Sequence, residues 1–79
     1  MMTYIATFYS HYGAIQFRKN CEKLNLTAVI MRVPRNLSSS CGTCVRFETE
    51  GEIPEQNEET EQIVRVEKDG YVIISGDGV

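Results

Sequence analysis

Two cysteines separated by two residues are the part of this chain whose spacing suggests chemistry. Cys41 and Cys44 form a CxxC pair, and Ser38, Ser39 and Ser40 precede it directly. This spacing brings two sulfurs within reach of a disulfide or of one metal ion. The chain has three cysteines, and an odd number is not typical of a secreted disulfide scaffold. In a reducing compartment, a CxxC is more often redox-active or metal-binding than structural.

Cys41 is the stronger candidate for a reactive thiol. Gly42 allows a tight turn, and a turned segment can aim backbone N–H groups at one sulfur. Ser39 and Ser40 offer hydroxyls, and Arg35 carries a charge that it cannot lose. Such a cradle would favour the thiolate, which is the nucleophilic form, and also an anionic persulfide or perselenide. The alternative is a small buried cysteine, which a polar loop makes less favourable.

The other cysteines and the single histidine have two interpretations each. Cys44 could be a resolving thiol that attacks an adduct on Cys41, or it could begin a strand and point into the core. Cys21 falls on the apolar stripe of an expected helix, which favours a core position over the alternative role of a third redox centre. His11 could move a proton to Cys41 if their loops meet, or it could be an exposed residue at a helix start.

No metal and no cofactor is expected within one chain. A zinc site needs four ligands, and besides the CxxC pair only Cys21 and His11 are candidates. These two lie ten residues apart on one expected helix, about 15 Å at the rise of an α-helix. A CxxC pair shared across a dimer is the metal-binding alternative. No Gly-rich phosphate loop and no Ser/His/Asp pattern is present.

A strand, a helix and a second strand are expected before the cysteine loop. Residues 4–9 are aromatic and β-branched with apolar residues on both faces, which is typical of a central strand. Ser10 suits an N-cap for a helix over 11–24, and Asn25 suits a left-handed stop. A strand over 27–33 ends at Pro34, which cannot donate to a sheet ladder.

The second half of the chain predicts strands and an acidic loop. Residues 45–49 alternate as a half-exposed strand, and 50–62 form a solvated loop or a frayed helix that serves solubility and spacing. Two β-branched runs, 62–67 and 71–75, flank a Lys-Asp-Gly turn signal and predict a hairpin. The alternative is a second helix over 56–68 before the last strand, as in ferredoxin-like folds. Residues 76–79 are expected as a loose tail.

Together these elements predict one α+β domain over residues 1–79. It has a β-α-β-β unit, one main helix on a four- or five-stranded sheet, and a C-terminal β-hairpin. A core of this size is modest, so burial of sheet surface in a homodimer is expected to help.

Charge and hydropathy restrict the class of partner and the location. Residues 1–47 carry six Lys or Arg and one acid, whereas 48–79 carry two and ten, for a net charge of −3. No aromatic-interleaved basic stripe is present, so nucleic acid is not an expected partner. The apolar runs are too short to span a bilayer, and the N-terminus does not resemble a signal peptide. A cytoplasmic location without membrane association is therefore expected.

The segment Pro34-Arg35-Asn36-Leu37-Ser38-Ser39-Ser40-Cys41-Gly42, behind a strand-helix-strand, resembles the selenium/sulfur (Se/S) carrier protein-like family of small bacterial domains. The resemblance covers about residues 3–48, and the family's cysteine corresponds to Cys41. It implies a cytoplasmic carrier, rather than a stand-alone enzyme, that holds a persulfide or perselenide. The carrier would receive its cargo from a donor such as a cysteine desulfurase and pass it to an acceptor enzyme.

The chain departs from the family pattern at two places, and two other functions stay open. The family commonly has an apolar residue where this chain has Cys44, and usually a clear helix after the third strand, where this chain is short and acidic. The first alternative function is a thiol–disulfide redox module that uses Cys41 and Cys44. The second is a binding or regulatory module whose cysteines are incidental.

Overall fold

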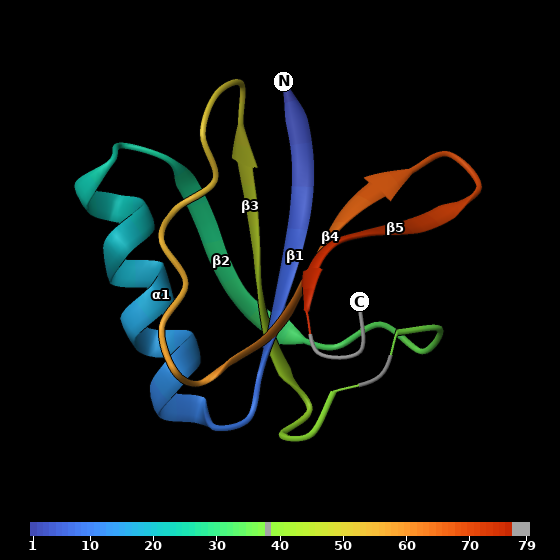
Figure 1. The fold of residues 1–79 in the computed structure, drawn as a ribbon, viewed down its shortest axis with the longest axis horizontal. Helices are drawn as coiled ribbons and strands as arrows, with labels where there is room; N and C mark the ends of the chain where they lie inside the picture. Colours follow the sequence, from blue (N-terminus) through green and yellow to red (C-terminus); the bar gives the residue numbers. More distant parts are fainter. Residues whose placement is uncertain (38, 77–79) are drawn as a thin grey trace.

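One helix packs on one face of a five-stranded antiparallel sheet in the computed structural model, which describes residues 1–37 and 39–76 (Figure 1). The elements are β1 (Met2–Phe8), α1 (His11–Lys23), β2 (Thr27–Arg32), β3 (Thr43–Thr49), β4 (Thr60–Glu67) and β5 (Gly70–Gly76). The sheet order is β2-β3-β1-β4-β5. Because β1 and β2 both run antiparallel to β3, they point the same way with β3 between them.

This architecture confirms the α+β prediction. β4 and β5 form the expected C-terminal hairpin, so the alternative of a second helix over 56–68 is wrong. Gly76 belongs to β5 and not to the expected tail. Ser38 and residues 77–79 of that tail lie outside the described residues. Within the described ranges, no helix is long and apolar enough to cross a membrane.

The helix begins and ends near the predicted residues. The backbone N–H of Gly13 donates to Oγ of Ser10 at 3.3 Å, so Ser10 is the N-cap. Asn25 adopts a φ of 60°, the left-handed conformation expected beyond the last turn. On the outer side, Arg18 and Glu22 form an ion pair at 3.1 Å, one turn apart.

An aromatic cluster fills the space between α1 and the sheet. The ring centroids of Phe17 and Phe47 lie 5.3 Å apart, and those of Tyr4 and Phe47 lie 5.4 Å apart. Phe8 adds a tilted contact with Phe17 at 5.4 Å. Aromatic pairs at such distances contribute packing beyond their buried area. The helix is thus fixed against β1 and β3, which sets the position of its first turn.

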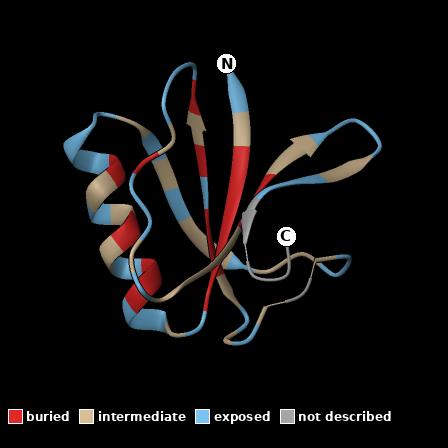
Figure 2. Cartoon of the chain, viewed as in Figure 1, coloured by how far each residue is buried: buried red, intermediate tan, exposed pale blue. Residues whose placement is uncertain are grey.

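β1 is buried on both sides over most of its length, as its sequence predicts (Figure 2). Its second face carries Ile5, which packs with Cys44 of β3 and Val64 of β4. Half-buried apolar side chains surround this second cluster; they are Met31, Val33, Leu37, Val66 and Tyr71. The chain therefore has a core on each face of the sheet, and the cysteine loop contributes to the second one through Val33 and Leu37.

The acidic segment between β3 and β4, predicted to serve solubility and spacing, also forms hydrogen bonds with residues at the start of α1. Pro54 in it is buried, and Nδ2 of Asn57 donates to the carbonyl of Gly13 at 3.1 Å. The backbone N–H of Tyr9 donates to the carbonyl of Glu59 at 2.8 Å. These bonds hold the segment against the start of α1, where a Cβ on Gly13 would clash with Cβ of Glu59.

Candidate functional site

The cysteine loop connects β2 to β3 and is closed by backbone hydrogen bonds. The N–H of Val33 donates to the carbonyl of Gly42 at 3.1 Å, and that of Leu37 donates to the carbonyl of Pro34 at 3.1 Å. Gly42 has a φ of +75°, a conformation that side chains disfavour. The turn at Gly42 therefore places Cys41 directly beside the first residue of β3.

The carboxylate of Glu61 on β4 anchors the end of this loop. It accepts the backbone N–H of Ser40 at 3.1 Å and the Ser40 hydroxyl at 2.8 Å. The hydroxyl of buried Thr7 on β1 donates to the same carboxylate at 3.3 Å. The Ser39 hydroxyl donates to the carbonyl of Phe8 at 3.4 Å. Both serine hydroxyls are thus used to fix the loop to the sheet.

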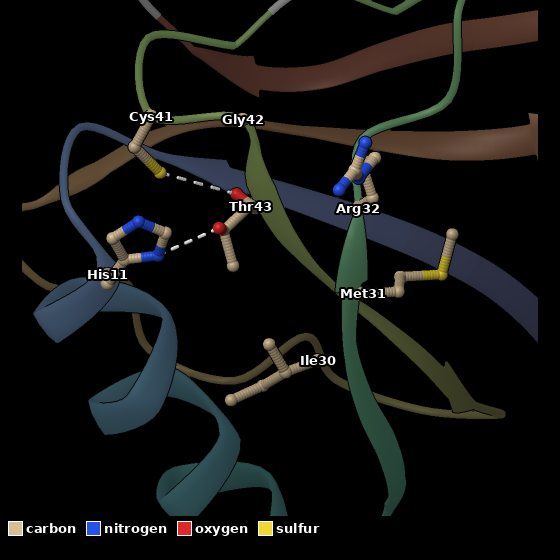
Figure 3. Close-up of a pocket in the computed structure, with 7 residues that line it drawn as sticks. All are labelled: His11, Ile30, Met31, Arg32, Cys41, Gly42 and Thr43. Atoms are coloured by element: carbon tan, nitrogen blue, oxygen red, sulfur yellow. Dashed lines mark hydrogen bonds between the residues drawn. The ribbon is translucent and has the colours of Figure 1, made fainter.

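A cavity of about 510 Å³ lies beside the loop, between the start of α1, the end of β2 and the start of β3 (Figure 3). The thiol of half-buried Cys41 donates to the carbonyl of Thr43 at 3.5 Å. Nδ1 of His11 lies 2.8 Å from Oγ1 of Thr43, within hydrogen-bonding distance. The cavity is lined by His11, Ile30, Met31, Arg32, Cys41, Gly42 and Thr43. Thr43 therefore links the imidazole and the thiol through its two oxygens.

The structure brings together only part of the set that the sequence suggested. Cys41 and Gly42 line the cavity together with His11. His11 is also an exposed residue at the start of α1, so both of its interpretations fit its position. Arg35 is exposed and does not line this cavity. The cation that does so is Arg32, which sequence reasoning did not single out. Arg32 pairs with Thr43 across β2 and β3. A prediction that these two strands pair would therefore have placed Arg32 beside the cysteine loop.

The two other cysteines are buried in the protein. Burial raises the pKa of Cys44 from 9.0 to about 11, and the nearby Cys41 adds to the shift. Burial likewise raises the pKa of Cys21 to about 11, with Glu22 as a second cause. Cys44 thus occupies the core position that was one of its two interpretations. All three cysteines are unpaired.

The described residues, 1–37 and 39–76, contain no group of three or more His, Cys, Asp or Glu side chains that could hold a metal ion. The side chains with reactive or charged groups that line the cavity are the Cys41 thiol, the His11 imidazole and the Arg32 guanidinium. A thiolate is the nucleophilic form of cysteine, and a neighbouring cation favours anionic sulfur.

Comparison with known proteins agrees with the resemblance noted in the sequence. The model of a family described as "Putative Se/S carrier protein-like" matches residues 3–71. This range contains α1, β2, β3, β4 and the cysteine loop, and all of β1 except Met2. Comparisons with curated proteins and with solved structures found no match.

Proposed function

We propose that this chain, which belongs to the Se/S carrier protein-like family, holds a sulfur or selenium atom on Sγ of Cys41 and passes it to a partner enzyme. The observation that carries this proposal is the placement of the three thiols. Cys21 and Cys44 are buried, whereas Cys41 is half-buried and lines a cavity. A cargo that must arrive from one protein and leave to another requires an accessible thiol.

Loading is a displacement on the outer sulfur of a donor persulfide. The Cys41 thiolate attacks that sulfur, a new S–S bond forms on Cys41, and the donor's S–S bond breaks. The electron pair of the broken bond leaves with the donor cysteine as its thiolate, which then takes a proton. No external oxidant or reductant is needed, and the same displacement applies to the selenium of a donor perselenide.

His11 and Arg32 supply the proton and charge chemistry of this step. The His11 imidazole lines the same cavity as Cys41, so in this proposal it accepts the proton that leaves the thiol. Unloading reverses the direction, and the protonated ring can return that proton. Arg32 adds a permanent positive charge to the lining of the same cavity, where it can attract the anionic cargo of the loaded form.

The remaining residues of the predicted cradle act on the loop and not on the cargo. Ser39 and Ser40 hold the loop to β1 and to Glu61, and Gly42 turns the backbone. Arg35 is exposed on the loop surface, where it is available to an acidic region of a donor or acceptor protein. A carrier of reduced sulfur or selenium works among reduced thiols, so a cytoplasmic location and a desulfurase-type donor belong to this proposal.

The placement of Cys44 does not favour the redox alternative. A resolving thiol must reach its partner as a thiolate. Cys44 is fully buried in the second core, and burial raises its pKa to about 11. The protein therefore needs Cys44 as an apolar packing group, in a position where an apolar residue would serve equally well.

Incubation with a cysteine desulfurase and cysteine, followed by intact-mass measurement under non-reducing conditions, tests the proposal. The wild-type protein should gain one sulfur atom, and Cys41→Ser should gain none. Cys44→Ala is the matched control at the other end of the CxxC, and it should load as the wild type does. Loading of Cys41→Ser, or loss of loading in folded Cys44→Ala, would refute the assignment.

A further inference from the structure

β5 lies at the edge of the sheet, although its sequence is typical of a strand in a sheet interior. Val72, Ile73 and Ile74 are consecutive apolar residues with 42%, 52% and 37% of their surface exposed. Strands that are apolar on both faces are usually covered on both faces, as β1 is in this protein. Nothing in the described chain pairs with the outer side of β5.

The usual protection of edge strands is weak in β5. Edge strands commonly carry a lysine or a proline that discourages pairing with another chain. Gly70–Gly76 contains neither, and no charged residue at all. An irregularity in pairing occurs only near its end, opposite Ile63 and Val64 of β4.

The opposite edge of the sheet is better covered. β2 is covered on one face by α1, which packs on β1, β2 and β3. It also ends in the charged residue Arg32. Figure 1 shows the β4–β5 hairpin extending away from α1, on the other side of β1. The exposed backbone and the exposed apolar side chains therefore coincide at β5.

We propose that β5 pairs antiparallel with β5 of a second copy of this chain, so that two five-stranded sheets become one of ten strands. Antiparallel pairing of a strand with itself follows a two-fold axis and closes the assembly at two copies. Because Gly70–Gly76 carries no charge, self-pairing brings no like charges opposite each other.

A standard interface takes about 800 Å² from each partner, roughly a sixth of the 5085 Å² that one chain exposes. An interface of this size includes side chains as well as backbone, and β5 has exposed apolar side chains on both of its faces. Val72 is opposite Arg65 on one face, and Tyr71 and Ile73 are opposite Val66 and Val64 on the other.

This pairing leaves both Cys41 cavities open. The cavity lies beside β2 and the start of β3, whereas β5 is at the other edge of the sheet. The end of β5 points the same way as the ends of β1 and β2. A two-fold axis at β5 therefore directs the two sites to opposite ends of the ten-stranded sheet, where each is free to meet a partner.

Sedimentation velocity over a range of protein concentrations tests the proposal. The wild-type protein should sediment as a monomer–dimer equilibrium. Ile73→Lys and Val72→Lys, one on each face of β5, should raise the dissociation constant at least about tenfold. Val29→Lys is the matched control on β2, where Val29 is 50% exposed, and it should leave the equilibrium unchanged. Circular dichroism verifies that each variant is folded.

Hydrogen exchange of the wild-type protein gives a second test that needs no variant. Backbone amides of Gly70–Ile74 should become more protected as protein concentration rises, and those of β2 should not. A wild-type protein that stays monomeric at every concentration would overturn the proposal. So would a dimer that Val29→Lys dissociates and Ile73→Lys does not, or an assembly that grows beyond two copies.

Discussion

The three cysteines should differ widely in their rates of alkylation in the folded protein. Burial raises the pKa values of Cys21 and Cys44 from 9.0 to about 11. At pH 8, this shift lowers the thiolate fraction of each about 100-fold relative to an unshifted thiol. Both side chains are also fully buried, so iodoacetamide reaches them only after the structure opens. Cys41 is half-buried and lines a cavity, so it should react first.

The assay is a time course with iodoacetamide at pH 8, acid quench, digestion and mass spectrometry of the three cysteine peptides. In native buffer, Cys41 should be modified at least about 100-fold faster than Cys21 or Cys44. In concentrated urea the three rates should converge, because burial is lost. Cys41→Ser, which removes the fast site, should leave only the slow phase. A native rate for Cys44 within about tenfold of that for Cys41 would refute the assignment of Cys44 to the core.

Three further predictions concern the stability of the folded protein. Glu61→Ala should lower the free energy of unfolding in urea by about 2 kcal/mol, because Ser40 and Thr7 lose a charged acceptor. Glu61→Gln should lower it less. Equal stability of the wild type and both variants would contradict the anchoring role of Glu61. The contribution of Cys21 and Cys44 to stability should be constant below pH 9 and fall as pH rises from about 9 to about 11, since the folded state holds their protons more tightly than the unfolded state. The fall should be shallower in folded Cys21→Ala and Cys44→Ala, and a curve that rises over this range would show the opposite linkage. Gly13→Ala should be destabilised by about 1–3 kcal/mol through the contact with Glu59, against a helix-propensity gain of about 1 kcal/mol. Gly51→Ala, whose Cβ meets nothing within 4 Å, is the control. A Gly13→Ala variant more stable than the wild type would contradict the close packing of Gly13 on Glu59.

The sequence predicted the elements well because their signals are local. Ser10, Asn25 and Pro34 mark helix and strand ends through their own backbone preferences. The hairpin of β4 and β5 follows from two β-branched runs around a turn signal. The boundaries were less accurate where pairing decides them. β3 begins at Thr43 and not at residue 45, because Thr43 and Cys44 pair with Arg32 and Met31 of β2.

The composition of the site was predicted less completely because its contacts are distant in the sequence. Closeness along the chain suggested Arg35, yet strand pairing brings Arg32 to the cavity. The serine hydroxyls looked available to a sulfur, but Ser40 is bonded to Glu61, 21 residues away. His11 joins the site through Thr43, 32 residues away, a contact that no local pattern contains.

The central claim is that Cys41 alone carries the transferred atom, and mapping the added sulfur onto one residue tests it most directly. The wild-type protein is loaded by a cysteine desulfurase, treated with an alkylating agent that preserves persulfides, digested, and analysed by tandem mass spectrometry. The added sulfur should be found on the peptide containing Cys41 and assigned to Cys41 within it. Its recovery on Cys21 or Cys44, or its absence from every cysteine, would refute the role of Cys41 as the carrier.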